Sequence, residues 1–316
     1  MSEEPNTEGP DERDDHVEGA TRCGFVALVG APNAGKSTLV NKLVGVKVSI
    51  VSHKVQTTRA LIRGLVIQDG AQIVFVDTPG IFAPKRRLDR AMVSTAWGGA
   101  TDADVIALLI DVRKGLDDDN LAILDKLADA PRRKILILNK IDMIARDQLL
   151  ALAQDAAARV SFDRIFMISA KTGDGVKDIP AYLADEMPLG PWLYPADDVS
   201  DLPMRALAAE ITREKLFARL HDELPYASTV ETEKWEVRPD GSARVEQTIF
   251  VERESQKRIV IGANGQTIKS ISMDARKEIS EIAETTVHLF LFVKVRENWG
   301  DDPERYREMG LQFPRN

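Results

Sequence analysis

The segment "GAPNAGKS" carries residue types that bind polyphosphates. It runs from Gly30 to Ser37, directly after the apolar run "FVALVG" and before the helical pattern "TLVNKLVG". Glycines let backbone amides wrap phosphate oxygens, Lys36 supplies a positive charge, and the Ser37 hydroxyl suits Mg²⁺. The full pattern in a strand–loop–helix context predicts a nucleotide phosphate site rather than a chance glycine-rich turn. The expected phosphate-site residues are Gly30, Asn33, Ala34, Gly35, Lys36, Ser37 and Thr38.

Two later segments distinguish GTP from ATP. "NKID" follows the apolar run "ILILN", and "SAK" follows "IFMIS", so both lie at the ends of expected strands. The Asp142 carboxylate can accept hydrogen bonds from the N1–H and the exocyclic amine of guanine, which adenine lacks, and the Ala170 amide can donate to the guanine carbonyl. Adenine would leave these polar groups unpaired, which favours guanine strongly. The expected base-site residues are Asn139, Lys140, Asp142, Ser169, Ala170 and Lys171.

Two further segments fit nucleotide-sensing switches. "DTPG", residues 77–80, offers a carboxylate that can hold Mg²⁺ through water and a glycine amide that can contact the γ-phosphate. "VSHKVQTTRA", residues 51–60, contains Thr57 and Thr58, either of which could complete the magnesium shell, and we favour Thr58. Such segments become ordered around the γ-phosphate and are released on hydrolysis. The expected metal ligands are Ser37, Thr58 and Asp77, and the expected catalytic residues are Lys36, Thr58 and Gly80.

Together these motifs resemble those of the translation-factor-related GTPases over about residues 24–186. One departure from the Ras pattern concerns Ile81, which occupies the place of the glutamine that orients the attacking water. Isoleucine can neither accept nor donate a hydrogen bond, so slow intrinsic hydrolysis is expected. In GTPases with a hydrophobic residue there, an asparagine similar to Asn33 helps hold potassium, which makes K⁺ a candidate cation. An asparagine that only caps or braces the loop is the alternative interpretation of Asn33.

The pattern of elements predicts an α/β fold for this part of the chain. Short apolar runs alternate with amphipathic stretches, and several runs are apolar almost throughout, as in strands covered on both faces. We therefore expect a doubly wound, mostly parallel sheet with the P-loop GTPase arrangement. The "DG" turn inside "LIRGLVIQDGAQIVFVD" predicts one antiparallel hairpin within it. The expected strands are 25–30, 61–67, 73–77, 105–111, 135–139 and 165–169.

Length and composition predict more than one domain. A chain of 316 residues suits two cores, and a single cysteine excludes an intramolecular disulfide. Residues 1–21 form an expected disordered acidic leader, since the first twenty hold eight acidic groups against one arginine. This leader lacks the basic start and apolar stretch of a signal peptide, and no window of the chain predicts a membrane-spanning helix. The proline-rich segment 188–203 is the expected linker between a GTPase domain, 22–187, and a second domain, 204–316.

The second domain has a different order of elements. We expect a helix over 203–220, strands near 228–237 and 243–253, a short strand over 257–261, a helix ending near 284 and a last strand over 287–295. The joint between that short strand and the following helix is Gly262-Ala263-Asn264-Gly265. This α+β arrangement resembles a type II KH module, in which the Gly-x-x-Gly backbone approaches single-stranded RNA. A plain tight turn remains the alternative, whereas a second nucleotide site is disfavoured because the third glycine and a GKS ending are absent.

Basic residues around this loop supply the expected RNA contacts. The two central loop positions, Ala263 and Asn264, are not basic, although one of them is basic in many KH loops. Lys257 and Arg258 before the loop and Lys269 after it are the expected substitutes. Binding through phosphates should weaken as salt rises. The expected RNA-binding residues are Lys257, Arg258, Gly262, Ala263, Asn264, Gly265 and Lys269.

A GTPase domain followed by a KH-like module resembles the Era family of bacterial ribosome-assembly GTPases. The resemblance covers about residues 22–310 and rests on "QTTR", "DTPGI", "NKID", "SAK", "VIGANGQTIKSI" and "VKVRENW" in this order. It implies a GTP-hydrolysing, Mg²⁺-dependent switch that binds the 3′ end of small-subunit ribosomal RNA and assists assembly of the small ribosomal subunit. It also implies a cytoplasmic protein with peripheral contact to the inner face of the cell membrane, and we expect a monomer.

Two competing functions remain open at this stage. One is a GTP-dependent RNA-modification or signalling protein with a C-terminal interaction module. The C-terminal half offers only His221 and His288 and no cysteine, so it has few residues for separate catalysis. The other is a purely structural ribosome-associated module, which measurable GTP hydrolysis would exclude.

Overall fold

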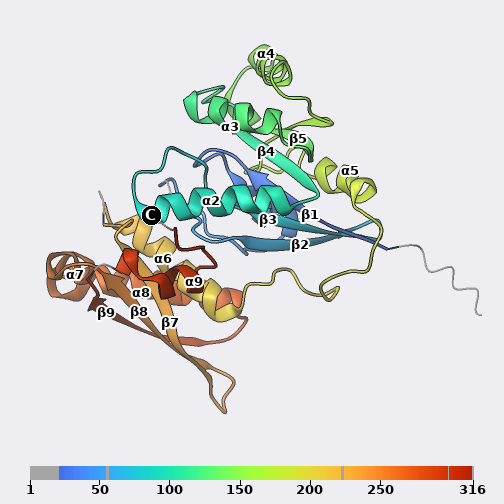
Figure 1. Cartoon of the computed structure of the whole chain (residues 1–316). Coiled ribbons are helices and arrows are strands. Elements are labelled where there is room, and N and C mark those ends of the chain that lie inside the picture. Colours follow the sequence, from blue (N-terminus) through green and yellow to red (C-terminus); the bar gives the residue numbers. More distant parts are fainter. Residues whose placement is uncertain (1–20, 55–56, 222–223, 298, 315–316) are drawn as a thin grey trace, which may run out of the picture.

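The structure is a computed structural model that describes residues 21–54, 57–221, 224–297 and 299–314. Apart from Thr21, the predicted acidic leader lies outside the described residues. Two separate sheets organise the chain, six-stranded in the N-terminal part and three-stranded in the C-terminal part (Figure 1).

The N-terminal sheet has the strand order β2-β3-β1-β4-β5-β6, and every neighbouring pair is parallel except β2 and β3. The predicted α/β class is confirmed, and so is the hairpin. Asp69 and Gly70 have φ angles of 48° and 77°, both positive as a two-residue hairpin turn of this kind requires. The strands are β1 (Arg22–Val29), β2 (Ile62–Gln68), β3 (Ala71–Asp77), β4 (Val105–Asp111), β5 (Arg133–Asn139) and β6 (Arg164–Ile168).

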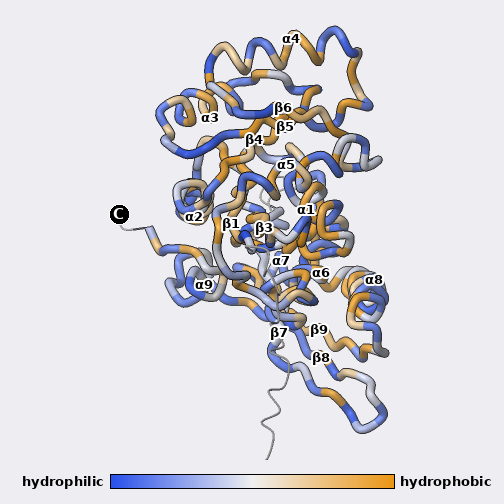
Figure 2. The backbone as a smooth tube through the Cα atoms, turned by 90° about the vertical axis from the view of Figure 1, so that its right-hand side faces the viewer, coloured by the Kyte–Doolittle hydropathy of each residue, from blue (hydrophilic) through white to orange (hydrophobic). Residues whose placement is uncertain are grey.

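Helices cover both faces of this sheet. One face packs against α1 (Lys36–Val44) and α5 (Asp178–Glu186). The other packs against α2 (Arg87–Asp102), α3 (Asp118–Ala128) and α4 (Arg146–Ala157). All seven residues of β3 and of β4 are buried, which explains their nearly continuous apolar sequence. In Figure 2 the hydrophobic colour accordingly gathers on the strands between the helix layers.

The C-terminal sheet has the order β7-β8-β9, with β7 and β8 antiparallel and β8 and β9 parallel. Residues of α6 and α8 pack on one face of this sheet and bury two adjoining apolar clusters. The sequence order is α-β-β-α-α-β, which confirms the predicted smaller α+β domain but has a helix where one strand was expected. The elements are α6 (Met204–Arg219), β7 (Ser228–Val237), β8 (Ala243–Val251), α7 (Glu254–Ile261), α8 (Gln266–Ile282) and β9 (Val287–Val295), with the short η2 (Ala263–Gly265) between α7 and α8.

The predicted strand over 257–261 is wrong, because these residues belong to α7. The β-branched run "RIVI" favoured a strand, but the start of the helix overrides that propensity. Gln256 accepts hydrogen bonds from the backbone amides of Glu252 (2.8 Å) and Arg253 (3.1 Å), which stabilises the first turn. The Gly-x-x-Gly segment therefore joins two helices, not a strand and a helix.

The proline-rich segment 188–203 packs against the N-terminal sheet, from β1 to the edge strand β2. Trp192 and Tyr194 pack near Cys23, Leu65 and Val74. The backbone amide of Cys23 donates to the carbonyl of Pro188 (3.1 Å), and that of Leu65 donates to the carbonyl of Val199 (3.0 Å). Much of this segment is therefore held against β1 and β2.

The C-terminal end of the described chain returns to the N-terminal sheet. Trp299 in η3 (Trp299–Asp301), Tyr306 in α9 (Pro303–Glu308) and Leu311 beyond it pack against Leu88 and Met92 of α2. Among the described residues, no helix combines the length and the apolar character that crossing a membrane requires.

Candidate functional site

A cavity of about 670 Å³ lies at the carboxyl ends of the parallel strands, where a doubly wound sheet is expected to bind ligands. It brings together segments that are far apart in sequence: the glycine loop, residues 50–54 with 57 and 58, Gly80, "NKID" and "SAK". Of the predicted nucleotide-site residues, Asn33, Gly35, Lys36, Ser37, Thr38, Thr58, Gly80, Asn139, Lys140, Asp142, Ala170 and Lys171 line it. The other four, Gly30, Ala34, Asp77 and Ser169, are buried and do not line the cavity.

The glycine loop curls tightly around the Lys36 side chain. Lys36 Nζ donates to the carbonyls of Gly30 (3.0 Å) and Ala31 (3.2 Å). Burial lowers the pKa of Lys36 to about 8, and nearby Asp77 opposes this shift. Gly35 has a φ of 102°, and a Cβ there would collide with the Asn139 amide, so only glycine fits this position. The loop is folded around a cation that phosphate oxygens could engage.

Four oxygen-bearing side chains converge beside Lys36. Asp77 Oδ2 accepts hydrogen bonds from Ser37 Oγ (2.6 Å), Ser49 Oγ (2.8 Å) and Thr58 Oγ1 (3.4 Å). Burial raises the pKa of Asp77, while Lys36 and the hydroxyls oppose the shift. Asp77 Oδ1 is buried and has no hydrogen-bond partner among the described residues. An unpartnered carboxylate oxygen among hydroxyls is the donor set that Mg²⁺ prefers, so the residues present fit that ion.

Thr58 rather than Thr57 reaches this cluster. Its Oγ1 lies 2.9 Å from Ser37 Oγ, whereas Thr57 Oγ1 donates to the Lys54 carbonyl (2.7 Å). Ser49 was not among the predicted residues. Its signal was weak, because it sits in "VKVSIVSH" without a motif around it.

Asn139 connects the two predicted base-site segments to the glycine loop. Its Nδ2 donates to the Ala34 carbonyl (2.8 Å), and its Oδ1 accepts from the amides of Ala170 (3.0 Å) and Lys140 (2.8 Å). The Asp142 side chain is exposed and lines the cavity, so it is accessible to a purine edge. The Ala170 amide, by contrast, is already engaged by Asn139.

Asp111 is a cavity residue that sequence reasoning missed. It accepts hydrogen bonds from Lys140 Nζ (2.7 Å) and Arg113 Nη2 (2.6 Å). Burial alone would raise its pKa, but these two cations lower the pKa of Asp111 to about 2. The available signal was a carboxylate at the end of the apolar run "VIALLID", at the same sheet edge as Asp77 and Asn139.

Ile81 lies in the core and not over the cavity. Its side chain is only 7% exposed and packs in the cluster that includes Ala31, and its amide donates to the Gly30 carbonyl (3.1 Å). Gly80 approaches the glycine loop so closely that a Cβ would lie 2.9 Å from the Pro32 ring. The position that holds glutamine in Ras-like enzymes therefore presents no polar side chain to the site.

The Gly-x-x-Gly loop is exposed and strongly curved. Gly262, Asn264 and Gly265 have φ angles of 74°, 52° and 75°. Nothing lies within 4 Å of a Cβ built on Gly265, whereas one built on Gly262 would collide with Thr267. Arg258, Ala263, Asn264 and Lys269 are exposed around this loop, and Lys257 is partly buried and 3.9 Å from Glu254. All seven predicted RNA contacts therefore occupy one stretch of surface from α7 to the start of α8.

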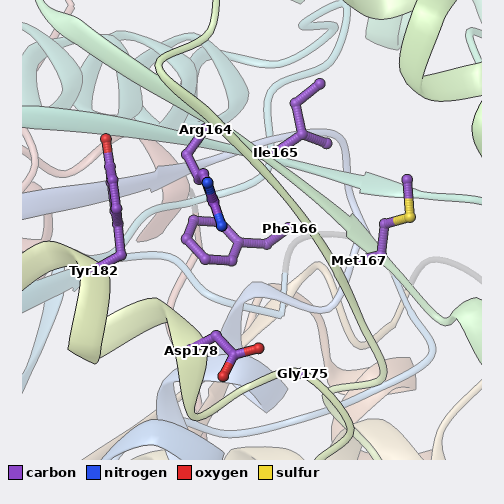
Figure 3. Close-up of a pocket in the computed structure, with 7 residues that line it drawn as sticks. All are labelled: Arg164, Ile165, Phe166, Met167, Gly175, Asp178 and Tyr182. Atoms are coloured by element: carbon purple, nitrogen blue, oxygen red, sulfur yellow. The ribbon is translucent and has the colours of Figure 1, made fainter.

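A second, smaller cavity of about 320 Å³ lies at the edge strand β6 and the start of α5 (Figure 3). Phe166 and Tyr182 meet edge to face there, with ring centroids 5.7 Å apart. None of the predicted nucleotide or RNA residues lines it.

Family models match both parts of the chain. The model described as "50S ribosome-binding GTPase" matches residues 25–140, and the model described as "KH domain" matches residues 223–300. The second match agrees with the helix–Gly-x-x-Gly–helix geometry and decides against an unspecified interaction module.

Curated relatives and solved structures are similar over nearly the whole chain. GTPase Era of Brucella suis is 68% identical over 294 residues, which cover 93% of this chain and 94% of that protein. GTPase Era of Agrobacterium fabrum is 69% identical over 295 residues, 93% of each chain. A crystal structure of Era in complex with MgGDPNP and nucleotides 1506–1542 of 16S ribosomal RNA has a TM-score of 0.86 and 36% identity, covering 92% of this chain and 99% of that one. A variant of Aquifex aeolicus Era bound to GDP and AlF₄⁻ gives the same values. With this identity and coverage on top of the two sites described above, the chain belongs to the Era family of GTPases.

Proposed function

We propose that this protein hydrolyses GTP, binds the 3′ end of small-subunit ribosomal RNA through its KH-like domain, and assists assembly of the small ribosomal subunit. The observation that carries the proposal is the convergence of Ser37, Thr58 and Asp77 beside Lys36, in a chain that also presents an open Gly-x-x-Gly loop. We further propose residues 22–187 as the GTPase domain, 188–203 as the linker and 204–316 as the RNA-binding domain. The two separate sheets and their separate cores support this division.

In the proposed mechanism, Lys36 and the loop amides hold the β- and γ-phosphates. Ser37 and Thr58 would ligate Mg²⁺ and Asp77 would hold it through water; the ion supplies charge neutralisation on the phosphates. Gly80 places its amide toward the γ-phosphate, and Asp142 selects guanine. Since Ile81 cannot orient water, intrinsic hydrolysis should be slow.

K⁺ is proposed as a second cation near the phosphates. Asn33 Nδ2 donates to the His53 carbonyl (2.9 Å) and so holds the backbone at His53 against the loop. That contact uses the nitrogen of the amide, and the oxygen is the end that could face a cation. Faster hydrolysis in KCl than in NaCl at equal ionic strength would support this role, and equal rates would contradict it.

The RNA part of the proposal is tested by binding to a defined oligonucleotide. The relative's complex points to the 3′ end of 16S ribosomal RNA, so a fluorescent RNA of that segment is the probe and a shuffled sequence the control. The expected result is tighter binding of the segment with a GTP analogue than with GDP. Equal affinity for both RNAs would contradict specificity, and equal affinity in all nucleotide states would contradict the switch. A monomeric state, a cytoplasmic location and peripheral membrane contact stay predictions from the family resemblance.

A further inference from the structure

Arg59 is a buried arginine in the segment that carries Thr58. Its side chain is only 4% exposed, yet it belongs to the loop between α1 and β2 and reaches into the C-terminal part of the chain. Its guanidinium donates to the carbonyls of Ser228 (2.9 Å), Pro225 (3.3 Å) and Tyr226 (3.4 Å). Pro225 and Tyr226 lie in the turn before β7, and Ser228 is the first residue of that strand.

Two aromatic rings complete the site around this guanidinium. The Arg59 carbon Cζ lies 5.8 Å from the ring centre of Phe217 on α6 and 5.7 Å from that of Trp299, after β9. Trp299 Nε1 donates to the Ala227 carbonyl (3.1 Å), which fixes its ring beside the same turn. A planar fork of donors suits several carbonyls and stacked rings at once, which a lysine could not match. We call these groups, namely Phe217, the carbonyls of 225, 226 and 228, and Trp299, the arginine cradle.

Residues next to Arg59 in the chain also form hydrogen bonds with the C-terminal domain. Arg213 of α6 donates to the Thr57 carbonyl, and Lys54 Nζ donates to the carbonyls of Phe217 (2.6 Å) and Leu220 at the end of α6. Thr58, between two such contacts, points the other way, to Ser37 and Asp77. Thr58 thus contacts the proposed magnesium ligands Ser37 and Asp77, while the residues on either side of it contact the KH-like domain.

From this geometry we propose that Arg59 is a positioning residue through which the C-terminal domain holds Thr58 in place for the triphosphate state. The proposal rests on the proposed function and adds the residue that links its two halves. Thr58 can leave the cluster freely only if Arg59 also leaves the cradle, which exposes three carbonyls and two rings. Because GDP has no γ-phosphate to order this segment, the contribution should appear for GTP and not for GDP.

The test measures affinities for a non-hydrolysable GTP analogue and for GDP, with Mg²⁺ and the full chain. Arg59→Met should lower the affinity for the GTP analogue by about tenfold or more, because buried hydrogen bonds of a charged group are lost. The affinity for GDP should change by less than about twofold. The kcat for GTP hydrolysis should fall by a similar factor to the affinity for the analogue. Arg59→Lys should recover only part of the effect, because the planar fork is missing.

Two matched variants separate coupling from damage. Arg159→Met removes an exposed arginine that pairs with Asp125 (3.6 Å), outside both the cavity and the cradle, and should change neither affinity. Trp299→Leu alters the cradle from the C-terminal side and should lower the affinity for the analogue although Thr58 and Arg59 themselves are unchanged. Thermal unfolding of each variant verifies folding, and Arg59→Lys stands in if Arg59→Met does not fold.

Equal losses of analogue and GDP affinity, or no loss at all, would overturn the proposal. The same variants are then tested for RNA binding, where the ratio between the GTP-analogue and GDP states should fall toward one. If the unmodified protein itself shows no nucleotide-dependent RNA binding, the proposed function fails. If it does and the Arg59 variants keep the ratio, only the role of Arg59 fails.

Discussion

The phosphate loop and the Gly-x-x-Gly loop need their glycines for different reasons. In the phosphate loop, Gly35 is needed because the folded protein leaves no room: a Cβ would strike Asn139, and the loop closes around buried Lys36. In the Gly-x-x-Gly loop, Gly265 has a similar backbone, with a φ of 75°, but open space on its outer side. The first loop is filled by the protein's own cation, and the second leaves its backbone accessible.

This difference separates two kinds of site. A loop packed against its own domain is pre-organised before a ligand arrives, so it can discriminate finely between similar small molecules. An open loop can accept a long polymer whose ends extend beyond the protein, and it depends more on charge. The following predictions test whether the two loops divide their roles in this way.

The largest effect is expected at the base end of the packed site. Asp142→Asn replaces one of the two carboxylate oxygens by an amide donor, so the guanine N1–H and exocyclic amine no longer both find an acceptor, and GTP binding should weaken by about a thousandfold. Calorimetry with GTP and ATP measures this, and Asp147→Asn, an exposed carboxylate on α4, serves as the control. ATP binding to the unmodified protein as tightly as GTP would contradict guanine selection.

The two glycines themselves allow a direct comparison. Gly35→Ala should lower GTP affinity by about a hundredfold and the free energy of unfolding by roughly 2–4 kcal/mol, because the added methyl collides with Asn139. Gly265→Ala should cost only about 1 kcal/mol for its positive φ and leave GTP affinity unchanged. Denaturant unfolding and nucleotide titration check both variants. Similar losses in the two would mean that the loops do not differ as described.

The buried cation predicts a pH dependence of nucleotide affinity. Lys36 has a pKa of about 8 in the free protein, and phosphate oxygens favour its charged form. Below that pH the lysine is already protonated, whereas above it binding must take up a proton. GTP affinity should therefore fall by up to about tenfold per pH unit above about pH 8. Guanosine, which has no phosphates, reports base ionisation alone, and an equal fall for guanosine would contradict the assignment.

The smallest effect is expected at the open loop. Gly265→Asp places a carboxylate where nothing lies within 4 Å and should weaken RNA binding by about threefold to tenfold through repulsion of phosphates. Gly265→Ala at the same position controls for backbone strain. The loss should shrink as salt rises, and a loss independent of salt would indicate misfolding of the loop.

Local motifs made much of the fold and the site predictable. The runs ending in Asp77 and Asn139 are fully or largely buried strands, and their carboxyl ends bring the motifs to one edge. Complete motifs carry their own spacing, so Lys36, Ser37 and Asp77 could be placed together before the structure was known.

Other features depend on contacts that no local pattern records. The residues "KRIVI" look like a strand, and only the cap formed by Gln256 and packing of Val260 make them helical. Ser49 and Asp111 join the site through distant partners. The arginine cradle is built from α6, the turn before β7 and Trp299, and a single arginine in "QTTR" gives no sign of them.

The attachment of residues 188–201 to the N-terminal sheet limits the separation between the N-terminal and C-terminal domains. Ser200 Oγ donates to the Arg63 carbonyl (2.7 Å), and Asp201 pairs with Arg63, while α6 begins at Met204. Only Leu202 and Pro203 separate Asp201 from Met204, so the connection spans at most about 10 Å of extended chain. Even when the other contacts between the two domains open, this short connection keeps the C-terminal domain close to the N-terminal sheet. An RNA bound to the C-terminal domain therefore stays close to the domain that binds and hydrolyses GTP.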